Sequence, residues 1–447
     1  MRVSELERKA ETGQPAAGGS AAEREGGYRY YVLGVLLFVY CINILDRQIL
    51  AILMEPVRLE LGLSDTQLGF MSGIAFALFY ATLGIPIARL ADRTSRTGVI
   101  SISIALWSVM TAVSGLAQNF WQMLAARIGV AVGEAGGTPP SHSLLADYFG
   151  EQQRATALGI FSLGGPLGMM IGLYFGGWLN EWFGWRITFI AVGLPGVVVA
   201  LLVWWTVREK PRVARPPSAE APPEYSIADV FRYLWQQRTF RYMSLASACQ
   251  AFVLYGVAQW YPVFFIRIHE MSTGEIGTYM ALVFGIGGGL GTFLGGYLAD
   301  RMAVRDRRWY LWVPMLATAG ATPFFFGVFF APTAGLAFLY MILPTLLVSA
   351  LFGPVFSTTQ GLVPPEMRAT AAAVLLFVIN IIGLGLGPQV VGLLSDLLRP
   401  QFGVDSLRYA LICVSMLTVV GAVLYWIAAR TLRADLDRVP GAANSSR

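Results

Sequence analysis

Four ionisable residues fall inside long apolar stretches of the sequence, where charged side chains are rare. Asp46 and Arg47 are adjacent in one stretch, and Arg127 and Glu134 share another. A charge near the centre of a bilayer costs at least about 2.5–3.5 kcal/mol, so it persists where it faces a cavity or a partner of opposite charge. If these stretches cross a membrane, the four residues therefore predict a buried polar site.

Spacing along the two helices places these groups in one region. Arg47 lies eight residues before Glu55, and Arg127 lies eight residues after Asn119, two positions at which the helices are expected to reach the same surface. At about 1.5 Å per residue, both arginines lie about 12 Å below that surface, and Glu134 lies about 10 Å deeper on the face that carries Arg127. We therefore expect the four groups to meet in one polar layer. The charges of its two carboxylates and two guanidinium groups sum to zero.

Protonation distinguishes the carboxylates from the arginines. Arginine keeps its proton in a protein, whereas a desolvated carboxylate can take one up. A proton on Asp46 or Glu134 would leave a net positive site and loosen one ion pair, which changes how the helices are held together. We therefore predict proton coupling through Asp46 first and Glu134 second, with Arg47 and Arg127 binding the solute. The alternative is a static lattice of ion pairs that only fastens the helices.

The other wall of the predicted site is aromatic and weakly polar. In the second half of the chain, charged residues stand only at the ends of the apolar stretches and none lies in their interior. A charged wall that faces an apolar wall suits an amphiphilic solute, whose headgroup would lie toward the two arginines. The further predicted binding residues, from both halves, are Tyr40, Asn43, Gln259, Trp260, Thr358 and Asn380.

The elements that must position these residues are long apolar helices. Hydrophobic residues make up 55% of the 447 and charged residues 13%, and the mean hydropathy is +0.59. A soluble chain has about a quarter of its residues charged, so most of this surface must face lipid. Twelve stretches suffice to cross a hydrocarbon core of about 30 Å as helices. They cover residues 28–54, 67–88, 98–117, 120–146, 154–179, 187–208, 241–266, 275–299, 309–330, 334–361, 368–394 and 407–432.

Two motifs recur at nearly the same separation along the chain. The segment 88–93 (Ala-Arg-Leu-Ala-Asp-Arg) returns as 296–301 (Gly-Tyr-Leu-Ala-Asp-Arg), 208 residues later. The tetrapeptide Arg-Ala-Thr-Ala at 154–157 returns at 368–371, 214 residues later. Such repeats indicate a duplicated six-helix unit, and the two copies are expected to enclose a site between them. The fold class is thus an all-α membrane protein with two pseudo-symmetric six-helix bundles.

The predicted domain boundaries follow from these helices and from composition. A disordered tail (1–27) precedes the first bundle (28–208), and a proline-rich linker (209–240) carries a short amphipathic helix that Ser226 can cap. The second bundle (241–432) ends in another tail (433–447). Of the 32 Lys and Arg residues, 25 lie on the side of the two tails, which predicts cytoplasmic termini in a bacterial-type inner membrane. This bias also explains the pI of about 9.1, so we expect no nucleic-acid partner.

The segment 89–96 (Arg-Leu-Ala-Asp-Arg-Thr-Ser-Arg) resembles the signature loop of the major facilitator superfamily, Gly-x-Leu-Ala-Asp-Arg-x-Gly-Arg/Lys. Ala88 and Ser95 replace its two glycines. Within that superfamily, the segments 43–47 (Asn-Ile-Leu-Asp-Arg) and 161–166 (Phe-Ser-Leu-Gly-Gly-Pro), with Arg127 and Glu134, resemble the Spinster branch. The resemblance implies alternating access and transport of a sphingolipid- or lysolipid-like solute. An organic-anion–proton symporter or a drug–proton antiporter of the same superfamily is the alternative.

The resemblance also implies that the repeated Asp-Arg loops gate the cytoplasmic side. Their aspartates sit at helix ends, where neighbouring arginines could clamp the two halves shut. The predicted gating residues are Asp92, Arg93, Arg96, Arg154, Asp300, Arg301 and Arg368. Simple positive-inside signals are the competing interpretation, which explains the arginines but not the repeated aspartates.

Other function classes lack the residues that they need. The sequence has no nucleotide-binding Gly-x-x-x-x-Gly-Lys-Ser/Thr loop and no metal-spaced His or Cys cluster, so we expect neither an enzyme nor a metal site. A channel is the remaining alternative. A flux assay would distinguish the two, because only a carrier saturates and shows counterflow. We expect no cofactor beyond a coupling proton, a small-molecule or lysolipid substrate, and a monomer in the lipid bilayer.

Overall fold

The computed structural model describes residues 18–210 and 226–438, and these residues form helices without a strand. Residues 18–206 make a first bundle and residues 238–436 a second. The helices of the first bundle are α2 (Gly18–Leu61), α3 (Asp65–Ser72), α4 (Ile74–Arg93), α5 (Arg96–Ser114), α6 (Phe120–Glu134), α7 (Thr138–Tyr148), α8 (Glu151–Ser162) and α9 (Gly164–Thr206).

The second bundle follows a short connecting helix, α10 (Ile227–Gln236). Its α-helices are α11 (Arg238–His269), α12 (Thr273–Leu282), α13 (Gly288–Ala303), α14 (Trp309–Phe330), α15 (Ala334–Ser349), α16 (Phe352–Gly361), α17 (Arg368–Ile379), α18 (Gly387–Phe402), α19 (Ser406–Ser415) and α20 (Leu417–Leu436). Two π-helical segments, η1 (Val283–Gly287) and η3 (Asn380–Leu386), and two 3-10 segments, η2 (Pro365–Met367) and η4 (Gly403–Asp405), complete it.

The described helices provide twelve membrane spans. Within residues 18–210 and 226–438, nine helical stretches are long and apolar enough to cross a membrane. Two of them, Gln152–Thr206 and Pro365–Leu436, hold two spans each, because the chain turns back at Gly184 (φ 77°) and between α18 and α19. The helices α6 and α7 supply the remaining span. The protein is therefore an all-α membrane protein of two six-helix bundles, as the sequence predicts.

Two predicted features differ from the structure. Residues 18–27 belong to α2 and not to a disordered tail, because Ala, Glu and Arg in this stretch are strong helix formers that continue the helix. The fourth predicted span (120–146) is interrupted between Glu134 and Thr138, where two glycines precede a pair of prolines. Residues 1–17, 211–225 and 439–447, which include most of the predicted tails and linker, lie outside the described residues.

Matching helix caps repeat the duplication seen in the sequence. Ser64 caps α3 in a capping box with Gln67, and Ser272 caps α12 in a capping box with Glu275. The two serines are 208 residues apart, the same separation as the two Asp-Arg loops. Each box satisfies free N–H groups at the start of the second span of its bundle.

The helix α10 is attached to the second bundle by one face. The Ser226 hydroxyl accepts a hydrogen bond from the backbone N–H of Asp229, which caps the helix where the sequence predicts it. Val230 and Leu234 are fully buried against the second bundle. Phe231 and Trp235 stack on each other with ring centroids 5.4 Å apart and stay exposed.

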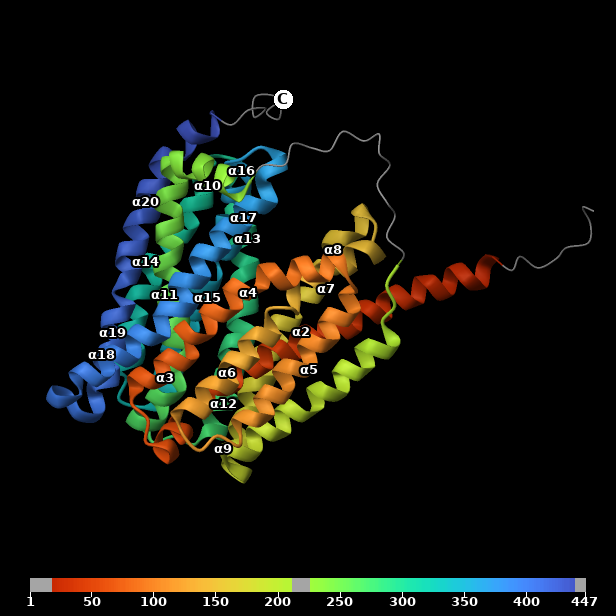
Figure 1. The fold of residues 1–447 in the computed structure, drawn as a ribbon. Coiled ribbons are helices and arrows are strands. Elements are labelled where there is room, and N and C mark those ends of the chain that lie inside the picture. The colour runs from red at the N-terminus through yellow and green to blue at the C-terminus, as the bar shows by residue number, and fades with distance from the viewer. Residues whose placement is uncertain (1–17, 211–225, 439–447) are drawn as a thin grey trace, which may run out of the picture.

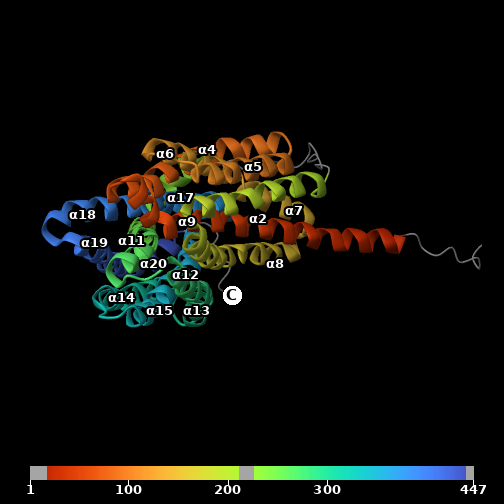
Figure 2. The same cartoon turned by 90° about the horizontal axis from the view of Figure 1, so that it is seen from below.

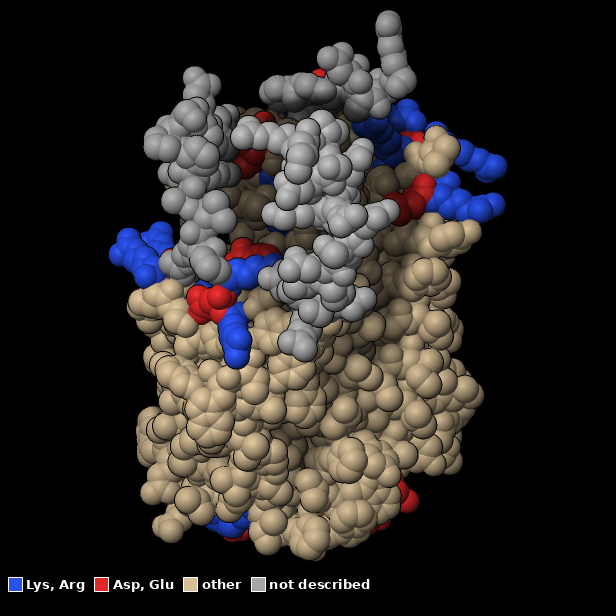
Figure 3. Space-filling view, turned by 90° about the vertical axis from the view of Figure 1, so that its right-hand side faces the viewer, with Lys and Arg blue, Asp and Glu red and all other residues tan. Residues whose placement is uncertain are grey.

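The outer surface carries a broad uncharged belt between two charged ends (Figure 3). Large apolar side chains such as Trp121, Trp205 and Phe293 are exposed on the molecule. An exposed apolar surface of this extent is stable only against lipid. The belt thus fixes the orientation of the bundles across a membrane.

The two bundles approach each other at one end and diverge at the other (Figure 1). Seen from below, α4, α5 and α6 lie at one edge of the molecule and α13, α14 and α15 at the opposite edge (Figure 2). The end at which α4 and α13 finish and α11 and α17 begin also holds the last turn of α20, and we call it the terminal end. The opposite end, where the bundles meet, is called the sealed end.

Candidate functional site

A buried ion pair joins α2 to α6 within the first bundle. The Arg47 Nε and Nη2 atoms donate hydrogen bonds of 2.9 and 2.6 Å to the same oxygen, Oε2, of Glu134. Glu134 is 1% exposed, and its second oxygen has no hydrogen-bond partner among the described residues. A charge at such a position is retained only with a partner, so Arg47 and Glu134 hold each other in place.

Two aromatic rings of α4 cover the arginine of this pair. The Arg47 guanidinium carbon lies 4.8 Å from the centre of the Tyr80 ring and 5.0 Å from that of Phe76. Arg127 approaches the Phe76 ring at 5.8 Å. The two rings stack on each other, because residues four apart lie on one helix face. Nothing in the sequence distinguishes them from the other aromatic residues of apolar helices, so the prediction omits both.

Asp46 differs from Glu134 in having no ion-pair partner among the described residues. Its side chain is fully buried, neither carboxylate oxygen has a described partner in good hydrogen-bond geometry, and the Thr111 hydroxyl interacts with it more loosely. Arg127, 2% exposed, has its Nε and Nη1 atoms unpartnered as well. The two groups lie within electrostatic range of each other and of Glu134. The structure therefore brings the four predicted residues together as one hydrogen-bonded pair and one looser pair.

Of the other predicted binding residues, Tyr40 and Asn43 lie beside this charged layer. Tyr40 is within electrostatic range of Arg47 and stacks on Phe161 at 4.9 Å. Asn43 is 4% exposed, and its amide nitrogen has no partner among the described residues. Their spacing from Arg47 places all three on one face of α2.

The four predicted residues of the second bundle lie on three elements, with Gln259 and Trp260 adjacent on α11, Thr358 on α16 and Asn380 in η3. Trp260 is fully buried in the sealed end, where its Nε1 donates to the carbonyl of Pro388 at 3.0 Å. Gln259 contacts the Met54 sulfur in the same region. Thr358 is buried and bonds to a carbonyl of its own helix, and Asn380 begins η3. A shared binding wall of these four residues therefore stays a prediction.

A small cavity of about 30 Å³ lies in the second bundle. Its lining includes Gln250, Leu254, Tyr255, Val355, Phe356 and Ile379. Gln250 is 4% exposed, and neither atom of its amide has a hydrogen-bond partner among the described residues. An unpartnered buried amide costs about 1–3 kcal/mol.

The sealed end is fastened by charges that the sequence analysis did not select. Arg267 on α11 donates to Glu55 on α2 at 2.6 Å and to Asp65 on α3 at 2.7 Å. Asp396 on α18 accepts hydrogen bonds from the backbone N–H and the hydroxyl of Thr66, both at 2.7 Å. These contacts all link the two bundles. Their positions near helix ends are a possible signal, but such charges are also common in ordinary loops.

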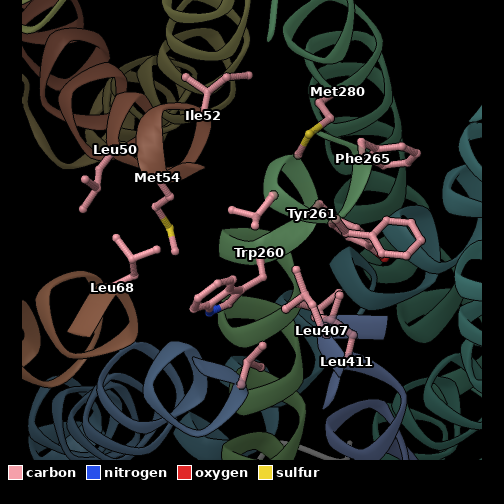
Figure 4. Close-up of a cluster of buried hydrophobic side chains, with 14 of the residues drawn as sticks. Leu50, Ile52, Met54, Leu68, Trp260, Tyr261, Phe265, Met280, Leu407 and Leu411 are labelled. Atoms are coloured by element: carbon pink, nitrogen blue, oxygen red, sulfur yellow. The ribbon is translucent and has the colours of Figure 1, made fainter. Parts of the chain in front are cut away.

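Packing between the bundles at this end is close. Met54 of α2 and Leu68 of α3 lie toward Trp260 of α11, and Leu50, Ile52 and Met280 belong to the same buried cluster (Figure 4). Small residues permit close helix crossings. A Cβ atom on Gly69 would lie 2.6 Å from the Pro388 carbonyl oxygen, and one on Gly177 would lie 2.2 Å from that of Thr273.

At the terminal end, the hydrogen bonds and ion pairs that the described gating residues make stay within one bundle. Arg96 pairs with Asp147, and Arg154 donates to the carbonyl of Ala146. In the second bundle, Asp300 accepts from the Tyr310 hydroxyl, and Arg301 donates to Tyr297. Asp92, Arg93 and Arg368 also lie at this end, and no ion pair between described residues joins the bundles there. The predicted clamp is not formed in this conformation.

Comparisons with known proteins give the family of this chain. Residues 36–388 match the model of the Major Facilitator Superfamily. An "MFS-type efflux pump" of Mycolicibacterium smegmatis is 35% identical over 93% of this chain and 96% of its own length. "Protein spinster homolog 1" of Homo sapiens is 27% identical over 91% of this chain and 82% of its own length.

A solved structure agrees with both the fold and the branch. A bacterial homologue of the human lysosomal transporter Spinster, in an inward-facing and unoccupied conformation, is 32% identical and superimposes with a TM-score of 0.84. The match covers 91% of this chain and 98% of that structure. The chain is therefore a multi-pass membrane transporter, and not an enzyme, that belongs to the Spinster-like branch of the Major Facilitator Superfamily.

Proposed function

We propose that the protein is a proton-coupled secondary transporter that moves an amphipathic, lysolipid- or sphingolipid-like solute by alternating access. The observation that carries the coupling is the charged layer: Asp46 is fully buried without an ion-pair partner among the described residues, beside Arg127 and the Arg47–Glu134 pair. A proton on Asp46 removes the attraction to Arg127 and leaves the layer net positive. The proton, and no other cofactor, is the coupling ion.

The choice of an amphiphile rests on the contrast between the two bundles. Arg47 and Arg127 of the first bundle offer an anionic or zwitterionic headgroup two positive charges. The second bundle offers a small and mainly apolar cavity. Several relatives are named as Spinster proteins, which supports the assignment of this chain to the Spinster-like branch. The identity of the solute has to be tested by experiment.

Alternating access requires two seals that close in turn. In this conformation the bundles are bonded at the sealed end through Arg267, Glu55 and Asp65. The gating proposal is that Asp92, Asp300 and their neighbouring arginines form the second seal when the terminal end closes. Ligand and proton then act by changing the relative stability of the two arrangements.

The excess of Lys and Arg at the terminal end supports cytoplasmic termini in a bacterial-type inner membrane, so this conformation would be inward-facing. The twelve spans enclose the charged layer within one chain, and we propose a monomer as the working unit. The partners are the lipid bilayer and the solute, with no role for nucleic acid.

Two other solute classes are favoured by specific relatives. A "Probable L-galactonate transporter" of Escherichia coli is 26% identical over 88% of this chain and 87% of its own length, and the two arginines suit a sugar acid as well as a lipid headgroup. The Mycolicibacterium smegmatis efflux pump favours drug–proton antiport. Each alternative retains proton coupling and differs from our proposal in the solute that is transported.

The solute is tested by counterflow in proteoliposomes preloaded with a lysophospholipid, a sphingoid base, a hexonate or a cationic drug. We expect saturable counterflow and thermal stabilisation of the purified protein with the lysophospholipid, and neither with the hexonate. Arg47→Ala with Arg127→Ala serves as the variant that lacks headgroup binding. Counterflow of the hexonate alone would contradict the lipid proposal, and unsaturable flux would indicate a channel.

A further inference from the structure

A groove of about 420 Å³ lies in the first bundle, between α3 and α4 on one side and α6 on the other. Its lining runs from Thr66 and Phe120, in the first turns of α3 and α6 at the sealed end, to Phe79 and Ile128. At about 1.5 Å per residue, these positions mark a length of about 12 Å along α6 and about 20 Å along α3 and α4. One leaflet of a hydrocarbon core of about 30 Å is about 15 Å thick, so the groove spans the leaflet at the sealed end.

The groove opens toward lipid. Phe70, Leu78 and Trp121 line it and are 36%, 49% and 73% exposed, so its rim belongs to the apolar surface of the molecule. Among the described residues that line it, none is charged. The groove therefore suits an apolar molecule that enters from the bilayer.

The polar side chains at the mouth of the groove already have partners within the chain. The Thr66 hydroxyl donates to Asp396 at 2.7 Å, and the side-chain oxygen of Gln67 accepts from the backbone N–H of Ser64 at 2.9 Å. A polar ligand would find few free groups here, whereas an apolar chain gains contacts along the whole groove. The volume also lies in the range of about 300–1,000 Å³ that is usual for small-molecule sites, and an empty groove would forfeit the dispersion contacts of its lining.

The second bundle contributes Gln389 of α18 to the lining of this groove. Gln389 lies at a close helix crossing, because a Cβ atom on Gly69 would be 2.9 Å from its Cα atom. A molecule in the groove therefore contacts both bundles beside the ion pairs of Arg267. A ligand that contacts both bundles in this arrangement favours it over one in which they separate at this end.

We propose that the groove binds one acyl chain of a phospholipid from the leaflet at the sealed end, and that this lipid helps to keep the sealed end closed. The lipid is a resident of the bilayer and not the transported solute, because α4 separates the groove from the charged layer. The Tyr80 ring faces Arg47, whereas the neighbouring Phe79 lines the groove. The site goes beyond the proposed transport and does not depend on which solute is carried.

The site is tested by native mass spectrometry of the full-length protein, extracted in mild detergent with added phosphatidylethanolamine. Wild type should retain one phospholipid per protein when the lipid on its outer surface has been removed. Ile74→Trp with Ile128→Trp enlarges two half-buried lining residues and fills the groove, so the retained fraction should fall at least fivefold. Leu290→Trp with Leu294→Trp is the matched control. These residues are exposed on α13 at the opposite edge of the molecule (Figure 2), and their replacement should leave retention unchanged.

The accessibility of the sealed end tests the effect of the lipid on the seal. With the native cysteines replaced, Met54→Cys reports opening of that end to a membrane-impermeant maleimide, since Met54 is fully buried there. Removal of the lipid should raise its labelling at least threefold in an otherwise wild-type chain. Labelling should stay low in the groove-filled variant, in which two indole rings take the place of the lipid. Unchanged labelling after removal of the lipid would overturn the effect on the seal.

A phosphatidylethanolamine with a diazirine in one acyl chain locates the retained lipid on the wild-type protein itself. After irradiation, we expect the crosslinked peptides to come from α4 and α6 and not from α13. Crosslinks spread evenly over these three helices, or equal retention by wild type and the groove-filled variant, would overturn the site. Arg47→Ala with Arg127→Ala should retain the phospholipid. Its loss in that variant would assign the groove to the transported solute and overturn the proposal.

Discussion

Arg267 and Asp65 form a two-bonded ion pair across the two bundles, with Nη1–Oδ2 and Nη2–Oδ1 distances of 2.7 Å each. The same guanidinium also bonds to Glu55, so one side chain of α11 holds both α2 and α3. The three side chains are at most 11% exposed. Because truncating one partner of a buried charge pair costs about 2–5 kcal/mol, this contact is strong enough to bias which end of the protein is closed.

Arg267→Gln should therefore open the sealed end. With the native cysteines replaced, Met54→Cys reports accessibility to a membrane-impermeant maleimide from that side, since Met54 is fully buried there. We expect labelling to rise at least tenfold in Arg267→Gln. Arg408→Gln, which breaks a local pair with Asp405, is the control and should not change the labelling. Equal labelling in all three backgrounds would show that Arg267 does not hold the seal.

The close helix crossing at Gly69 should also be needed to keep the sealed end closed. Gly69→Ala places a Cβ 2.6 Å from the Pro388 carbonyl oxygen, so one helix must move, at a cost of about 1–3 kcal/mol. Gly34→Ala meets no atom within 4 Å and should gain up to about 1 kcal/mol from helix propensity. Thermal unfolding in detergent should show a lower midpoint for the first variant and an unchanged or higher one for the second. An unchanged midpoint in Gly69→Ala would mean that the crossing is looser than described.

Stacking and hydrogen bonding at Arg47 should make lysine a poor replacement. Arg47→Lys keeps the charge but loses the two N–H groups that bond Glu134 and the planar contact with Tyr80 and Phe76. We expect counterflow to fall at least tenfold, with a smaller loss of thermal stability than in Arg47→Ala, which leaves Glu134 unpaired. Wild-type counterflow in Arg47→Lys would reduce the role of Arg47 to its charge alone.

The sequence predicted the candidate site best where charged residues lie inside long apolar stretches. Helix rise and the cost of burying charge predict one polar layer that holds Asp46, Arg47, Arg127 and Glu134. They do not predict that Arg47 pairs with Glu134, which the helix rise places about 10 Å deeper, yet these two residues are hydrogen-bonded. Trp260 shows the limit, because α11 is apolar on most sides and no pattern indicates which face enters the seal. The π-helical segments η1 and η3 also left no signal, since they depend on packing between glycine-rich helices.

The proposed clamp at the terminal end predicts a conformational effect of Asp92→Asn. If Asp92 pairs across the bundles when that end closes, its loss should favour the conformation described here. Spin labels at Ser95→Cys and Arg305→Cys, one on each bundle, should then show a larger share of long distances. Asp405→Asn, at the other end, is the control. An unchanged distance distribution would favour a simple topology signal over a gate.

The central claim is that Asp46 carries the coupling proton, and transport by proteoliposomes with and without an imposed pH gradient tests it most directly. One proton moving down a membrane potential releases about 2.3 kcal/mol per 100 mV, and a carboxylate must exchange that proton for the protein to use this energy. Asp46→Asn should abolish the response to the gradient while exchange of bound solute continues, and Glu134→Gln should weaken both, because Arg47 loses its partner. A full response to the gradient in both variants would contradict the account and leave the charged layer as a fastening between helices.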